Sequence, residues 1–168
     1  RINPDRMLDS FTQLALIGAT GDGGVNRPTF SDAHLAAREW LRTEIERSGL
    51  EFRSDGAGNH SAFFLCAGQH APTLLLGSHL DSVPNGGRFD GALGVMAALE
   101  VLKTFKENGV RLKVNLEAID FTDEEGTLVG LLGSAALAGH ISQKDLASPR
   151  GGRENLVAGI MRAGLSDA

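Results

Sequence analysis

Two short stretches of the sequence carry side chains that could bind a metal and move protons. The first places His79 and Asp81 directly after the apolar residues 73–77, and the second is the acidic run Asp123-Glu124-Glu125. Because residues two apart on a strand point to the same side, His79 and Asp81 should project together. The imidazole could then bind a metal while the carboxylate fixes its tautomer. An isolated pair of this kind is also typical of a plain hydrogen bond at a strand end.

A third candidate ligand is Asp90, in the sequence GGRFDG at residues 86–91. It precedes a run with helical spacing, so capping that helix is the simpler role, since aspartate favours the N-cap. The alternative role is to bridge two divalent cations with its two oxygens. The flanking glycines favour that alternative, because they allow a cation to approach the backbone closely.

The acidic run follows residues 111–121, which alternate and are rich in β-branched and apolar types, and which predict a second buried strand. Solvated loops also contain acidic runs. Carboxylates crowded at a strand end repel one another, however, unless a cation or a proton relieves them. A two-metal site would use one of them as a ligand and another to carry a proton from water to a leaving nitrogen.

The elements that must position these groups alternate between strands and helices. In such open α/β sheets, sites lie beyond the carboxyl ends of the strands, where all the candidate ligands fall. The periodicity predicts helices over residues 5–17, 32–48, from 92 to a close at 106–109, 134–138 and 155–163, and strands over 50–53, 59–65, 73–77 and 111–121. We therefore predict an α/β fold.

Composition narrows the class of protein. The 168 residues carry a net charge of −5, which leaves no basic footprint for nucleic acid. No apolar run approaches the roughly 20 residues of a membrane span, and no signal peptide is visible. The single cysteine, Cys66, excludes an internal disulfide and favours a cytoplasmic location. A first residue other than Met predicts a fragment, and the absence of a closing strand after the last helix predicts that it is incomplete on its C-terminal side.

The sequence resembles a known family of two-metal amidohydrolases. GSHLDSVPNGGRFDGALGV at 77–95 and DFTDEEG at 120–126 are similar to the N-carbamoyl-L-amino-acid hydrolases, allantoate amidohydrolases and β-ureidopropionases, relatives of the aminoacylase and dipeptidase metallopeptidases. The likeness extends to GGVNRPTFSDAHLAAREWL at 23–41 and DGAGN at 55–59, so it covers most of the chain.

The resemblance implies a role for each candidate residue. His79 would bind one metal, Asp90 would bridge both, and Glu125 would bind the second. Glu124 would be the general base, and Asp81 would orient His79. The two divalent ions would be Zn²⁺ first, with Mn²⁺, Co²⁺ or Ni²⁺ as alternatives. The substrate would be a small N-carbamoyl amino acid or ureide, hydrolysed at a linear C–N bond.

The resemblance also implies that parts of the family's enzymes are missing from this sequence. The fold would be a three-layer α/β/α metallohydrolase catalytic domain with a mixed sheet. Residues 1–168 would form the N-terminal portion of that domain, without the dimerisation domain of a homodimeric enzyme. The family usually has an arginine after Gly-Ser, where this chain has Ala135. Further histidine ligands would fall beyond Ala168, and His140 lacks the context of a ligand. The fragment alone is therefore expected to be inactive. The alternatives are an aminoacylase or dipeptidase, a metal-binding domain without catalysis, or a purely structural domain.

Overall fold

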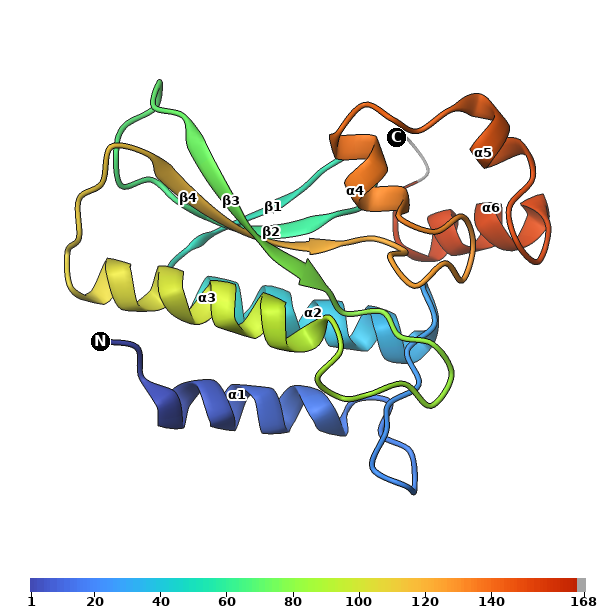
Figure 1. Cartoon of the computed structure of the whole chain (residues 1–168), viewed down its shortest axis with the longest axis horizontal. Coiled ribbons are helices and arrows are strands. Elements are labelled where there is room, and N and C mark those ends of the chain that lie inside the picture. The colour runs from blue at the N-terminus through green and yellow to red at the C-terminus, as the bar shows by residue number, and fades with distance from the viewer. Residues whose placement is uncertain (166–168) are drawn as a thin grey trace.

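A four-stranded mixed sheet forms the centre of the computed structural model, which describes residues 1–165 (Figure 1). The strands are β1 (Glu51–Ser54), β2 (His60–Phe64), β3 (Thr73–His79) and β4 (Asn115–Phe121), in the order β1-β2-β4-β3. The helices are α1 (Pro4–Leu16), α2 (Asp32–Arg47), α3 (Ala92–Glu107), α4 (Leu132–Leu137), α5 (Gln143–Ala147) and α6 (Arg153–Arg162). The predicted α/β class with a mixed sheet is confirmed.

Strands β3 and β4 place the candidate ligands. They pair in parallel from Thr73 opposite Asn115 to His79 opposite Phe121, whereas β2 pairs antiparallel with β4. Both strands therefore end at the same edge of the sheet, as predicted. β4 begins at Asn115 rather than at residue 111, and the Asn115 side chain accepts hydrogen bonds from the backbone of Cys66 and Ala67.

Helices α2 and α3 lie on one side of the sheet, and α1 packs outside them against α3 (Figure 1). Apolar residues of these helices and of the strands above them form the main core, centred on Leu41, Met96 and Leu102. α1 is also held by an ion pair, because Arg6 donates from Nε and Nη2 to the two oxygens of the buried Glu100. The helices after β4 gather at the ends of the strands, where α4 contacts β4.

Two histidines of the interior are held in different ways. His34, in the first turn of α2, is fully buried, and its Nδ1 accepts a hydrogen bond from the Phe30 N–H, 2.9 Å away. The buried Nδ1 of His60 has no hydrogen-bond partner among residues 1–165, and its ring meets that of Phe52 edge-on with centroids 5.0 Å apart.

Candidate metal centre

His79, Asp90 and Glu125 converge at the edge of the sheet where β3 and β4 end. One ligand atom from each lies within 4.8 Å of the other two. They come from the last residue of β3, the turn before α3 and the segment after β4. The resemblance implied all three as ligands. The parallel pairing of β3 and β4 brings His79 and Glu125 together, and the turn before α3 adds Asp90. One imidazole and two carboxylates form a donor set that suits Zn²⁺ and neighbouring divalent transition metals.

The His79 ring is oriented by Asp81. Its Nδ1 lies 3.0 Å from the Asp81 backbone oxygen and 3.4 Å from Asp81 Oδ1, while its Nε2 lies 3.7 Å from Glu125 Oε1. Burial alone would lower the pKa of His79, but the hydrogen bond to Asp81 and the charges of Asp81 and Glu125 raise it to about 9. A proton on Nδ1 directed at Asp81 leaves Nε2 as the atom that faces the carboxylates of the cluster.

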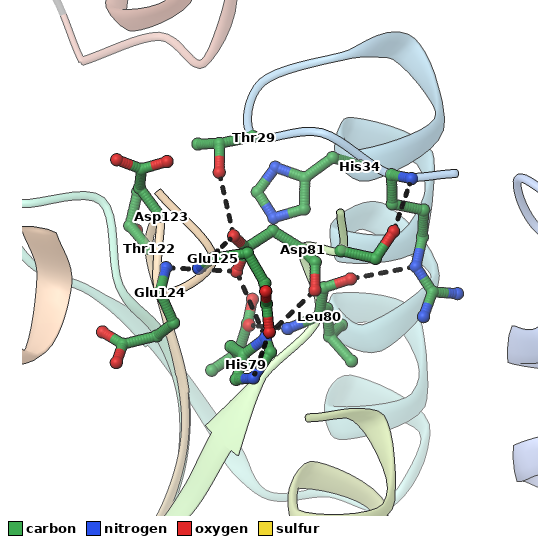
Figure 2. Close-up of polar contacts among 12 residues, drawn as sticks. Thr29, His34, His79, Leu80, Asp81, Thr122, Asp123, Glu124 and Glu125 are labelled. Carbon is green, nitrogen blue, oxygen red and sulfur yellow. Dashed lines mark hydrogen bonds and ion pairs between the residues drawn. The ribbon is translucent and has the colours of Figure 1, made fainter. Parts of the chain in front are cut away.

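Asp81 joins the end of β3 to the acidic segment (Figure 2). Its side chain is fully buried, and its Oδ2 accepts hydrogen bonds from Thr29 Oγ1 at 3.1 Å and from the Glu125 N–H at 3.0 Å. Its Oδ1 accepts a longer bond, 3.4 Å, from the Glu124 N–H. Burial opposes ionisation of Asp81, but the bonds from His79 and from the Glu125 N–H lower its pKa overall. Asp81 therefore stays an anion and fixes both neighbouring segments.

Asp90 precedes α3 without capping it. The N-cap position is Gly91, and in this described segment no side chain makes a capping hydrogen bond. Asp90 is exposed, so its oxygens are free to meet a cation. Gly91 has a φ of +63°, and a Cβ there would lie 2.4 Å from the His79 backbone oxygen and 2.5 Å from its ring. Only glycine allows the start of α3 to approach His79 so closely.

Glu124 points differently from Glu125. Its Oε1 accepts a hydrogen bond from the Ser134 N–H at the start of α4, 3.2 Å away. Figure 2 shows its carboxylate turned away from His79. The structure therefore brings four of the five predicted site residues together, and it leaves the side chain of the fifth at the rim of the cluster.

Asp123 has a role that sequence reasoning missed. It is fully buried with a φ of +58°, and its carboxylate accepts hydrogen bonds from the N–H groups of Leu128, Val129 and Gly130. It thus anchors the loop that follows the two glutamates. The available signal was an aspartate followed by a Gly-rich segment, because short acidic side chains often bond to nearby backbone.

Two buried arginines were also missed. Arg27 is fully buried, and its Nε donates to the Leu80 backbone oxygen at 2.9 Å. Arg38 pairs with Asp120 at 2.9 Å in the interior. A signal existed for Arg38, because it lies on the stripe of α2 that also carries the buried Ala37, Leu41 and Ile45.

Comparison with known proteins places the segment that carries the cluster in a family. The model of peptidase family M28 matches residues 65–150, the part of the chain that contains β3, β4 and every predicted site residue. The chain belongs to this family. Residues 65–150 also include the whole of α3, so the match covers the three elements that carry the cluster.

Curated relatives of this M28-family chain are amidohydrolases. It is 36% identical over 166 residues to an N-carbamoyl-L-amino acid amidohydrolase of Geobacillus stearothermophilus, covering 98% of this chain and 41% of that protein. It is 38% identical over 146 residues to an allantoate amidohydrolase of Bacillus subtilis, covering 84% and 35%. The chain thus spans about two fifths of the length of these relatives.

A solved structure has the same fold. The hydantoinase/carbamoylase family amidase of Burkholderia ambifaria superposes with a TM-score of 0.90 at 34% identity, over 98% of this chain and 42% of that one. The predicted resemblance to the carbamoylase group is confirmed. No helix in the part of the chain that the structure describes has the length and apolar character needed to cross a bilayer.

Proposed function

We propose that the protein containing this chain is a metal-dependent amidohydrolase that cleaves a linear C–N bond of an N-carbamoyl amino acid or a ureide. The observation that carries the proposal is the cluster of His79, Asp90 and Glu125, oriented by the buried Asp81. The names of the curated relatives supply the substrate class. Residues 1–168 are then the N-terminal portion of a catalytic domain, which agrees with their spanning 41% of a relative.

The residues present fit divalent metals. One imidazole nitrogen and two carboxylate oxygens lie within 4.8 Å of one another, and these are donor types that such ions take. His79 would hold one ion through Nε2, Glu125 would hold a second, and Asp90 would bridge them. We infer Zn²⁺ first, and Mn²⁺, Co²⁺ or Ni²⁺ as alternatives. By the same resemblance, we infer a cytoplasmic homodimer.

Such ions, when bound, supply Lewis acidity that makes water a nucleophile at neutral pH. The chain's own residues do the rest. Asp81 keeps the proton on Nδ1 of His79, and its bonds from the Glu124 and Glu125 N–H groups fix the acidic segment beside the cluster. Glu124 is the general base: it takes a proton from water and returns it to the leaving nitrogen. To do so, its Oε1 gives up the bond from the Ser134 N–H.

The general-base assignment is tested with Glu124→Gln in the protein containing this chain. Metal content should stay unchanged, because Glu124 is not a ligand, and turnover should fall about 10²- to 10⁴-fold. Glu154→Gln, an exposed position in α6, is the matched control and should leave both unchanged. Metal content is read by atomic emission, and turnover by release of ammonia or amine. Turnover above a tenth of the wild-type rate would refute the assignment.

A second candidate function is an aminoacylase or dipeptidase. The match to a family described as peptidases favours it. Relative kcat/KM on N-carbamoyl, N-acetyl and dipeptide forms of one amino acid, and on allantoate, separates the two candidates. Preference for the carbamoyl or ureido compound supports the proposal. Preference for the acetyl compound or the dipeptide would contradict the proposal and support the second candidate function.

A further inference from the structure

Arg38 lies in the interior beneath the metal centre and makes three hydrogen bonds there. Its side chain is 3% exposed. Nε donates to Asp120 Oδ2 at 2.9 Å, Nη1 to the Gly58 backbone oxygen at 2.8 Å, and Nη2 to Thr122 Oγ1 at 2.9 Å. One planar guanidinium therefore reaches three acceptors on two segments, which a lysine ammonium at the end of a flexible stem does not reproduce.

The Asp120 contact leads to the end of β3. The second oxygen of Asp120, Oδ1, accepts a hydrogen bond from the Leu80 N–H at 2.8 Å. The parallel ladder between β3 and β4 stops at His79 opposite Phe121, so this carboxylate continues the pairing by one residue beyond the ladder. Leu80 lies between His79 and Asp81, and fixing its peptide fixes the start of both side chains.

The Thr122 contact leads to the end of β4. Thr122 follows the last residue of that strand and immediately precedes the acidic residues 123–125. Its N–H donates to Asn59 Oδ1 at 2.9 Å, and its hydroxyl accepts from Arg38. Arg38 thus contacts the end of β4 directly, through Nη2 and Thr122. It contacts the end of β3 indirectly, because Nε binds Asp120 and Asp120 binds the Leu80 N–H.

We propose that Arg38 is a positioning residue that sets the separation of His79 from Glu125 by tying the ends of β3 and β4 to α2. The inference rests on the proposed function, because it assigns Arg38 a purpose only if these residues bind metal. Stability alone is a weak reason for such a pair. Packed apolar side chains of similar volume fill an interior without the cost of desolvating two charges.

The test compares Arg38→Lys and Thr122→Val with the control Arg42→Lys in the protein containing this chain. Arg42 lies one helical turn further along α2, but its side chain is 49% exposed and pairs with Glu46. Thr122→Val removes one acceptor of Arg38 and keeps its ion pair with Asp120. It therefore still tests the inference if Arg38→Lys does not fold. Circular dichroism checks the fold, amide exchange of Leu80 reports the strand ends without metal, and titration with Co²⁺ reports the site.

We expect Arg38→Lys to weaken Co²⁺ binding about tenfold, the lower end of what outer-shell substitutions cost, and to speed exchange at Leu80. Thr122→Val should weaken Co²⁺ binding less, and Arg42→Lys should change neither measurement. Unchanged Co²⁺ affinity in folded Arg38→Lys and Thr122→Val, beside a wild-type protein that binds Co²⁺, would overturn the positioning role alone. A wild-type protein that binds no Co²⁺ would overturn the metal site itself and the inference with it.

Discussion

Replacing Asp123 measures how firmly the acidic segment is held. In the folded protein its carboxylate is fully buried and accepts from the N–H groups of Leu128 at 3.1 Å, Val129 at 2.6 Å and Gly130 at 2.9 Å. Hydrogen bonds to a charged group contribute about 1.5–3 kcal/mol each. The three share one carboxylate, and only Leu128 is buried, so water can satisfy part of the loss.

These contacts give a ranked expectation for three substitutions. Asp123→Ala should lower the free energy of unfolding by about 4 kcal/mol, of which about 1 kcal/mol comes from placing alanine at a φ of +58°. Asp123→Gly loses the same hydrogen bonds without that strain and should cost about 3 kcal/mol. Asp123→Asn keeps an acceptor oxygen and tolerates the left-handed backbone, so it should cost about 1 kcal/mol.

Urea denaturation followed by circular dichroism measures the three differences, provided that the slope with urea stays constant. Amide exchange at residues 128–130 should rise in Asp123→Ala and Asp123→Gly, and less in Asp123→Asn. Two results would refute the reasoning. One is an Asp123→Ala protein within about 1 kcal/mol of wild type, and the other is an Asp123→Gly protein less stable than Asp123→Ala.

Two further predictions concern the glycine beside the ligands and a buried histidine. Gly91→Ala should weaken Co²⁺ binding in calorimetric titration, because the new Cβ meets His79 at 2.4–2.5 Å. Gly139→Ala, with a similar φ of +70° and nothing within 4 Å, should not, and equal effects would contradict the steric argument. Burial, together with the nearby charge of Arg38, lowers the pKa of His60 from 6.5 in the unfolded chain to about 3 in the folded protein. Below pH 6.5 the unfolded chain therefore binds a proton that the folded protein does not, and the free energy of unfolding falls as the pH falls. His60→Gln should therefore remove about 1.4 kcal/mol of the stability difference between pH 7.5 and pH 5.5 in urea titrations, and an unchanged difference would contradict the shifted pKa.

The positions of the ligands could be predicted because they depend on local rules. Apolar runs ending in polar residues define strand ends, and parallel strands end at one edge, so His79 and Glu125 meet without any knowledge of packing. The role of Asp90 was less determined, because an aspartate before a helix has a simpler use as a cap. The structure places Gly91 at the cap and leaves Asp90 exposed near the other ligands.

The supporting contacts could not be predicted because they join residues far apart in the sequence. Arg38 and Asp120 are 82 positions apart, and no local pattern pairs them. His34 illustrates the same limit, since its place in a first helical turn suggests exposure, but the preceding loop folds over it and donates the Phe30 N–H to its ring. Local periodicity identified α2, and long-range packing decided which of its polar residues are buried.

The parallel crossover between β3 and β4 also affects how the chain folds. Two parallel strands cannot be joined by a tight hairpin, so the segment containing α3 must close as a long loop before they pair. His79 and Glu125 become neighbours only after that closure. A metal that needed both residues would bind the folded arrangement and not the unfolded chain, so it would stabilise the folded state by mass action. The free energy of unfolding would then rise with the concentration of free metal, and removal of the metal would lower it.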